Sequence, residues 1–282
     1  TLSSSSAASD VYKRQWGLKN MKSAPTGMGE NTRVSIIGVR GVPIIKENDD
    51  LGRIISEAAQ KQGTPIQDGD VIVVAQKIVS KAEGRIVKFS SVRPSKFASM
   101  VSKMAKKKAE LVELILMESK AVVRMSGHHL ITETKQGWVS ANSAVDVSNV
   151  SGGDAASLLP ENPDKSASKI RDRVRGLTGK DVAVIISDTF GRPLRCGHVD
   201  VAIGVSGINP FFDRRGEKDL FGYVLRVKQM AVVDELASAA ELIIGQAGES
   251  VPVAIIRGYK YPRSETARAT DLIRPKEKDL FL

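Results

Sequence analysis

The chain has 282 residues, of which 41% are hydrophobic and 26% charged. This composition is ordinary for a globular protein with one large domain or two modest ones. The net charge of +10 makes a polyanionic partner one interpretation. One cysteine, Cys196, and three histidines exclude an intrachain disulfide and an ordinary zinc cluster. No run approaches the roughly 18 apolar residues of a membrane span. Because a single cysteine cannot form an intrachain disulfide, we expect a cytoplasmic protein.

Residues 1–33 are predicted to be a leader outside the fold. The opening TLSSSSAASDVYKRQ is rich in serine and has no apolar core typical of a signal peptide. We interpret it as translated adapter or upstream sequence, with Met21 or Met28 as the expected start. The main domain is then expected over residues 34–262, followed by a C-terminal tail over residues 263–282.

Strands and helices alternate in the first part of this domain. Residues 33–39 are a predicted strand, and residues 68–76 are predicted to be a turn followed by a buried strand. Between them, apolar residues share one face of a helix that starts near residue 51, with Asn48 or Asp49 as its expected N-cap. The inward-facing residues of that helix are expected to be Leu51, Ile54, Ile55, Ala58 and Ala59.

A long helical pattern covers residues 95–120, with a break near Lys108. Two strands joined at residues 135–137 are predicted within residues 129–142. The apolar face of the helical segment is expected to contain Phe97, Met100, Val101 and Met104.

A stretch rich in turn formers near residues 150–165 is the predicted internal boundary or long loop. A helix follows, with Ile170, Val174 and Leu177 expected to face inward. Further on, the expected elements are strands at residues 182–188, 198–207 and 251–258, and a helix at residues 231–244. Several neighbouring strands are expected to be antiparallel. The predicted fold class is therefore α+β, with mixed parallel and antiparallel sheets.

Familiar nucleotide-binding motifs are absent from the sequence. RGLTGKD lacks the spacing of a P-loop, and no G-x-G-x-x-G of a Rossmann fold follows a strand. Cys196 and His198 lie two residues apart without an orienting group, so an incidental cysteine is favoured over a catalytic one.

Polar residues follow two apolar strands. Asp188 and Thr189 end the strand VIIS, and Asp146 ends another in SANSAVD. Either aspartate could be a helix cap or a turn residue. The alternative is a hard-cation site, because Mg²⁺ and Mn²⁺ prefer oxygen ligands and often bind one or two carboxylates plus phosphate oxygens.

Two segments could face a phosphate. VVAQKIVSKAEGR places Gln76, Lys77, Lys81 and Arg85 after a buried strand, where α/β proteins tend to bind ligands, although a solvated basic loop has the same pattern. Gly245 and Gly248 follow a predicted helix. They would permit close approach of the backbone to a ligand, or simply cap the helix.

Taken together, these segments resemble the coenzyme F420-0:γ-glutamyl ligase family. The similarity runs in order from about Val34 to Gly258, and LIRPKEKDLF near the end also fits. The matching stretches are GVPIIKENDDL, DGDVIVVAQKIVSKAEGRI, NSAVDVSNV, VAVIISDTFGRPLRCGHVDVAIGVSGI and DELASAAELIIGQAGESVPVAIIRG.

The resemblance implies a homodimeric enzyme with a two-part α+β fold. Such an enzyme uses GTP and Mg²⁺ or Mn²⁺, with K⁺ as a further candidate ion, to join L-glutamate to coenzyme F420-0 and then to add γ-linked glutamate. The expected chemistry is phosphoryl transfer to a carboxylate, followed by attack of the glutamate amine on the acyl phosphate.

The resemblance also implies residue roles. Asp146 and Asp188 fall on metal positions, and Thr189 and Gln246 on those of a second ion. Asp146, Asp188 and Lys81 are the expected catalytic residues. The GTP-contact positions are Val42, Pro43, Ile44, Ile45, Gln76, Lys77, Lys81, Asn149, Ile244, Gly245, Gln246, Ala247, Gly248, Glu249, Ser250 and Val251.

Two other functions compete with this reading. A ligase of the same family could act on another acceptor, such as a folate. A basic module could instead bind nucleic acid, but aromatic residues make up only 5% of the chain, and no aromatic and basic stripe is present. We therefore expect small-molecule partners and no nucleic acid or membrane.

Overall fold

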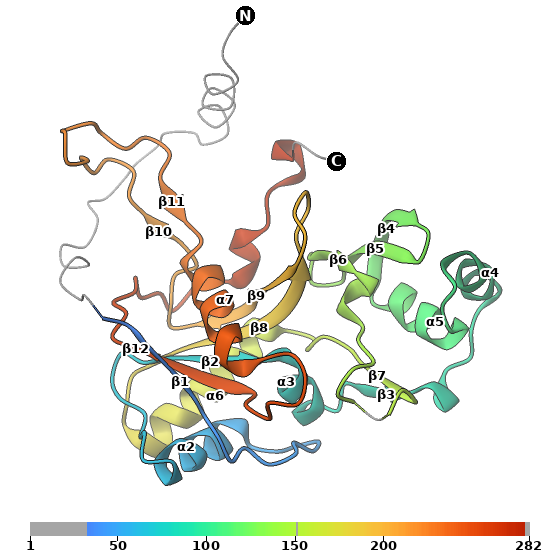
Figure 1. Cartoon of the computed structure of the whole chain (residues 1–282), viewed down its shortest axis with the longest axis horizontal. Coiled ribbons are helices and arrows are strands. Elements are labelled where there is room, and N and C mark those ends of the chain that lie inside the picture. Colours follow the sequence, from blue (N-terminus) through green and yellow to red (C-terminus); the bar gives the residue numbers. More distant parts are fainter. Residues whose placement is uncertain (1–32, 151, 280–282) are drawn as a thin grey trace, which may run out of the picture.

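A mixed five-stranded sheet forms the centre of the larger part of the molecule (Figure 1). The structure is a computed structural model that describes residues 33–150 and 152–279. The predicted leader therefore lies outside the described residues, apart from Arg33. In spatial order the strands are β1 (Ser35–Gly38), β12 (Val253–Arg257), β2 (Val71–Ala75), β8 (Ala183–Gly191) and β9 (His198–Ser206).

Within this sheet, β2 and β8 are parallel and every other neighbouring pair is antiparallel. Val71 to Val74 are fully buried, as expected for a central strand that is covered on both faces. The β8–β9 register shifts next to Ser187. There β9 holds one extra residue, because Ile186 pairs with Gly204 whereas Ser187 pairs with Ala202. Such a bulge re-aims the side chains around it.

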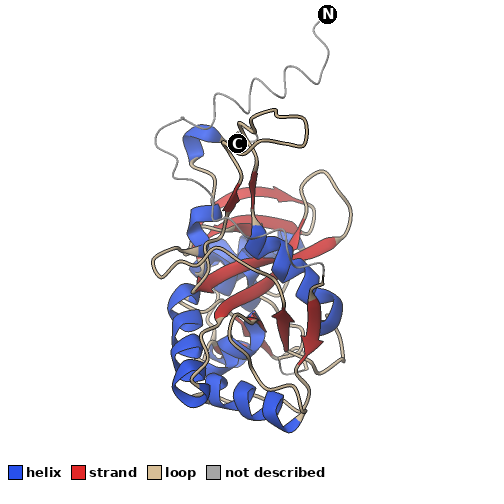
Figure 2. Cartoon of the chain, turned by 90° about the vertical axis from the view of Figure 1, so that its left-hand side faces the viewer, coloured by secondary structure: helices blue, strands red, loops and turns tan. Residues whose placement is uncertain are grey.

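Helices cover the sheet (Figures 1 and 2). α2 (Leu51–Lys61) packs on α6 (Pro163–Thr178), which in turn packs on β8 and β9. α7 (Val232–Ile244) packs on β9 and β12 from the other side of the sheet in Figure 1. A short helix, α3 (Gln76–Ala82), continues directly from β2.

Two details of these helices differ from the prediction. The N-cap of α2 is Asp50, whose Oδ1 accepts the Arg53 N–H at 3.0 Å, and not Asn48 or Asp49. Asn48 instead occupies the preceding turn with a φ of 67°. On α6, Ile170 and Val174 are buried as predicted, but Leu177, in the last turn, is 45% exposed.

A second, smaller core lies to the right in Figure 1. It contains α4 (Lys96–Ala105), α5 (Ala109–Met117) and a three-stranded sheet. Its strands are β4 (Ser119–Ser126), β5 (His129–Thr134) and β6 (Val139–Ala141), and a two-stranded sheet of β3 (Ile86–Lys88) and β7 (Ala155–Ser157) lies beside it.

The predicted break near Lys108 is confirmed, since α4 ends at Ala105 and α5 begins at Ala109. The predicted end of the helix at residue 120 is wrong, because β4 begins at Ser119. The predicted apolar face is also mostly wrong. Phe97, Met100 and Met104 are between 52% and 57% exposed, whereas Val101 is buried with the small residues Ala98 and Ala105. Small residues let α4 approach α5 closely, which turns the larger ones outward.

A projecting arm joins β9 to α7 and was not predicted. Its base is the pair β10 (Phe212–Asp213) and β11 (Gln229–Met230), and the arm rises away from the main sheet in Figure 1. At its tip, Leu220 and Phe221 are 98% and 96% exposed.

The predicted fold class of α+β with mixed sheets is confirmed by these sheets. The predicted domain limits at residues 34–262 and 263–282 and near residues 150–165 stay predictions. Within residues 33–150 and 152–279, no helix combines the length and apolar character needed to cross a membrane.

Candidate active site

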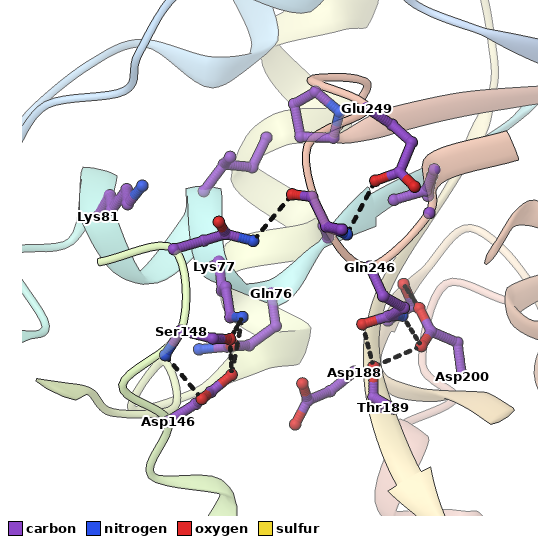
Figure 3. Close-up of a pocket in the computed structure, with 18 of the residues that line it drawn as sticks. Gln76, Lys77, Lys81, Asp146, Ser148, Asp188, Thr189, Asp200, Gln246 and Glu249 are labelled. Carbon is purple, nitrogen blue, oxygen red and sulfur yellow. Dashed lines mark hydrogen bonds and ion pairs between the residues drawn. The ribbon is translucent and has the colours of Figure 1, made fainter. Parts of the chain in front are cut away.

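The carboxyl ends of the parallel strands β2 and β8 open into a cavity of about 590 Å³ (Figure 3). Nearly all of the predicted site residues line it, although they come from five separate segments of the chain. Those on its wall are Val42, Pro43, Ile44, Ile45, Gln76, Lys77, Lys81, Asp146, Asn149, Asp188, Thr189, Ile244, Gly245, Gln246, Ala247, Glu249, Ser250 and Val251.

Two of the predicted residues lie elsewhere. Gly248 does not line the cavity although both of its neighbours do. Arg85, which the lysine-rich segment placed among the phosphate-facing residues, does not reach the cavity either. Its guanidinium pairs with Glu118 at 2.7 Å and donates to the Leu159 carbonyl at 3.0 Å. Arg85 therefore joins the smaller core to the main part of the molecule.

Lys77 and Asp146 form an ion pair on one wall of the cavity. Lys77 Nζ lies 2.7 Å from Asp146 Oδ2, and Ser148 donates to the same carboxylate through both its N–H and its hydroxyl. Burial opposes ionisation of Asp146, but the bonds from Lys77 and Ser148 outweigh it and hold the pKa of Asp146 below its usual value. Asp146 is thus a charged carboxylate in a fixed orientation.

Lys81 lies one helical turn beyond Lys77 on α3. Burial, and then the positive charge of Lys77, lower the pKa of Lys81. Gln76, at the start of the same helix, is buried. Its Nε2 donates to Ser80 at 2.5 Å and to the Leu158 carbonyl at 3.2 Å, so this amide nitrogen braces the wall of the cavity.

Asp188 occupies the middle of the cavity. In Figure 3 its carboxylate lies between Asp146 and Thr189, and it accepts a hydrogen bond from the Thr189 N–H. Burial raises the pKa of Asp188 to about 7, and the nearby carboxylates of Asp200 and Asp146 add to this effect. A carboxylate placed among other carboxylates is poised to accept a cation.

Thr189 and Gln246 belong to a further wall of the cavity, which we call the third wall. Thr189 Oγ1 lies 3.0 Å from Gln246 Oε1. Both also contact Asp200, which is only 3% exposed: Thr189 Oγ1 donates to its Oδ1 at 2.9 Å, and Gln246 Nε2 to the same oxygen at 3.1 Å. Burial raises the pKa of Asp200, and Glu241 adds to this effect.

The loop after α7 closes the top of the cavity in Figure 3. Gly245 has a φ of 70° and a ψ of −178°, a backbone conformation that is essentially restricted to glycine. Glu249 in turn accepts the Ala247 N–H at 2.8 Å, and the Ala247 carbonyl accepts a hydrogen bond from Asn149 at 3.2 Å. The loop is thereby tied to the Asp146 wall.

The donor set fits a divalent ion that keeps other ligands. No cluster of three or more His, Cys, Asp or Glu residues suited to a metal occurs in the part of the chain that the structure describes. Asp188 and Asp146 would supply only two carboxylates. Mg²⁺ and Mn²⁺ are often held in this way, with water and phosphate oxygens completing the coordination.

Sequence reasoning missed Asp200 and Glu241. Asp200 lies on an alternating apolar strand, opposite Thr189 across the β8–β9 pair. The available signal in the sequence was a carboxylate among the small residues, Ala202 and Gly204, that alternate with larger apolar ones.

Comparison with known proteins gives a consistent result. A model of the F420-0:Gamma-glutamyl ligase family matches residues 39–258. The chain is 45% identical over 249 residues to the coenzyme F420:L-glutamate ligase of Methanothermobacter thermautotrophicus, covering 88% of this chain and 98% of that protein. It is 46% identical over 252 residues to the enzyme of the same name from Methanocaldococcus jannaschii, covering 89% and 98%.

A third relative, the coenzyme F420:L-glutamate ligase of Archaeoglobus fulgidus, is 40% identical over 249 residues, which cover 88% of this chain and 96% of that protein. These matches establish that the protein is an enzyme of the ligase class. The chain belongs to the F420-0:gamma-glutamyl ligase family.

Proposed function

We propose that this enzyme joins L-glutamate to coenzyme F420-0, and then γ-linked glutamate to the product, at the expense of GTP and with Mg²⁺ or Mn²⁺. K⁺ is included as a further ion. The observation that carries the proposal is the pair of carboxylates, Asp146 and Asp188, facing one cavity beside Lys77 and Lys81. The names of the relatives supply the glutamate and the F420 acceptor.

The cavity suits a nucleotide in size and charge. Its volume of about 590 Å³ lies within the range of roughly 300–1,000 Å³ typical of small-molecule sites. Lys77 and Lys81 would face the phosphates from α3, while the backbone around Gly245 can approach a ligand closely. The net positive charge of the chain would attract anionic substrates.

The proposed reaction begins with a carboxylate of the acceptor, which is a poor acylating agent. Transfer of the γ-phosphoryl group from GTP makes it an acyl phosphate and releases GDP. The glutamate amine then attacks the acyl carbon, the amide forms, and phosphate leaves. Asp146 holds Lys77 in place for the phosphates, and Asp146 and Asp188 would hold the divalent ion, which would neutralise charge that develops on the transferred group.

Isotope labelling tests the acyl phosphate. With ¹⁸O in the acceptor carboxylate, one label is expected in each released phosphate, because the carboxylate oxygen that attacks phosphorus leaves with it. Mass spectrometry of phosphate and product checks this. The product should gain one glutamyl unit for each GDP. Unlabelled phosphate would exclude the acyl phosphate. If no deazaflavin acceptor gave a glutamyl product but a folate did, the acceptor would be reassigned.

A homodimer in the cytoplasm is also proposed. The arm supports self-association, because its tip exposes Leu220 and Phe221 yet has a defined conformation. Asp219 Oδ1 accepts the N–H groups of Phe221 and Tyr223 at 2.9 and 2.8 Å. Exposed apolar side chains on an ordered projection are typical of an interface.

Replacing both Leu220 and Phe221 by serine is expected to convert the dimer into a monomer. The substitutions remove the apolar area that the partner would bury, while neither side chain supports the fold. Sedimentation or light scattering measures the mass. Met104→Ser, which removes an apolar side chain that is 57% exposed on α4, is the control and should stay dimeric. A monomeric wild-type protein, or a double variant that stays dimeric, would contradict the proposal.

A further inference from the structure

The Asp200 carboxylate takes up the hydrogen-bond donors of the third cavity wall. The single proton of Thr189 Oγ1 has two acceptors in reach, Asp200 Oδ1 at 2.9 Å and Gln246 Oε1 at 3.0 Å. A carboxylate is the stronger acceptor, so this proton belongs to Asp200 whenever another group engages Gln246 Oε1. The lone pairs of Thr189 Oγ1 are then left for the cavity.

Two carboxylates also fix the orientation of the Gln246 amide. Its Nε2 donates to Asp200 Oδ1 at 3.1 Å and to Glu241 Oε1 at 2.9 Å, which uses both amide hydrogens. Rotating the amide by 180° would set its oxygen against two carboxylates, so Oε1 is held towards Thr189. When the Thr189 proton points to Asp200, the wall therefore offers two oxygens, Thr189 Oγ1 and Gln246 Oε1, with no proton between them.

The Thr189 hydroxyl can bridge the 3.0 Å to Gln246 Oε1 with a hydrogen bond, but once its proton points to Asp200 the two oxygens repel each other unless a cation lies against both. Neighbouring oxygen ligands of a Mg²⁺ ion bound at roughly 2.1 Å are about 3 Å apart, which agrees with this separation. Asp188 lies on the cavity side of the same wall and adds negative charge.

The support behind these oxygens is rigid. Asp200 Oδ2 accepts the Ser187 hydroxyl at 2.9 Å, and the Asp200 N–H donates to Glu241 Oε2 at 3.0 Å. Ser238, on α7, donates to the Asp200 carbonyl at 2.7 Å. The carboxylate is thus fixed from β8 and α7 at once.

We propose that Asp200 and Glu241 are positioning residues that orient Thr189 and Gln246 as a pair of oxygen ligands for a second hard cation. The inference rests on the proposed metal-dependent function, and it adds to it the two acidic residues that set the proton positions. Neither carboxylate is itself assigned to the ion.

Direct binding of Mn²⁺, followed by electron paramagnetic resonance in the presence of GDP, tests the inference. The wild-type protein is expected to bind two ions. In Asp200→Asn an amide replaces the carboxylate and competes as a donor, so the second ion should bind roughly 10 to 100-fold more weakly, while the first is unchanged. Asp234→Asn is the matched control. Asp234 is also a partly buried acid, and its Oδ1 accepts, at 2.9 Å, the N–H of Ala202, which lies on the same strand as Asp200. It should bind both ions normally.

A second substitution separates positioning from a general structural role. Glu241→Met removes the other acceptor of Gln246 Nε2 and keeps the length of the side chain, so the second ion should again bind roughly 10-fold more weakly while the first is unchanged. Normal binding of both ions by Asp200→Asn or by Glu241→Met, or equal weakening of the two ions, would overturn the inference and leave the proposed function standing. A wild-type protein that binds no Mn²⁺ would overturn both.

Discussion

Replacing Asp188 by asparagine is expected to reduce turnover at least roughly 100-fold, with the fold retained. The amide is a weaker ligand for a hard cation than the carboxylate, which lies between Asp146 and Thr189 in the cavity. Thermal stability should not fall, because the substitution removes a charge that Asp200 and Asp146 repel. Steady-state kinetics over a range of Mn²⁺ concentrations, with melting curves of the same samples, measure both effects.

Asp172→Asn provides the control for this variant. Asp172 is an exposed aspartate on α6 whose carboxylate contacts Ser168 at 3.4 Å, and its substitution should leave activity and stability unchanged. Near-normal turnover by Asp188→Asn at limiting Mn²⁺ would exclude Asp188 as a metal ligand. A melting temperature well below that of the wild type would instead show that its carboxylate supports the fold.

Replacing Arg171 by leucine is expected to lower the free energy of unfolding by about 3 kcal/mol. Arg171 lies on α6 and is 4% exposed, and its guanidinium binds three groups from other parts of the chain. Nε donates to the Val182 carbonyl at 2.7 Å, Nη2 contacts Asp181 at 2.9 Å, and Nη1 contacts Glu265 at 2.5 Å. Leucine would leave the carbonyl without this donor and separate residue 265 from the helix.

Chemical denaturation at fixed pH measures this loss. Glu265→Gln is the matched control. The Glu265 side chain is 69% exposed and remains solvated when the pair is broken, so its removal should reduce stability by at most about 1 kcal/mol. Equal effects of the two variants would show that the stabilisation comes from the exposed ion pair and not from the buried guanidinium.

Sequence patterns predicted those cavity residues that have a charged side chain and lie just after an apolar strand. Asp188 comes after Ser187 and the four apolar residues 183–186 of β8, and Lys77 is the second residue after β2, so their places after apolar strands made them candidate ligand-binding residues. β2 and β8 are parallel neighbours, which brings these two ends together. The resemblance to a ligase family then added residues with no such local signal, such as Val42 and Asn149.

Other features depend on contacts that no local pattern contains. Asp200 becomes part of the cavity wall through its pairing with Thr189 and the bulge in β9, neither of which is visible in an alternating strand. The wrong face of α4 was chosen because large apolar residues were assumed to point inward, whereas its small ones meet α5. The arm between β10 and β11 was not predicted, and its tip exposes Leu220 and Phe221, the opposite of what apolar side chains usually indicate.

The pairing of β1 with β12 has a consequence for the order in which the protein can assemble as it is synthesised. Residues 35–38 form hydrogen-bonded pairs with residues 254–257, so the main sheet cannot be completed until nearly the whole domain has left the ribosome. The smaller core, in contrast, draws on one continuous stretch from Ala98 to Leu158. We expect the smaller core to form before the first strands have paired. Contacts between distant residues form slowly, and the cavity, which needs residues from 42 to 251, would be the last part of the molecule to appear.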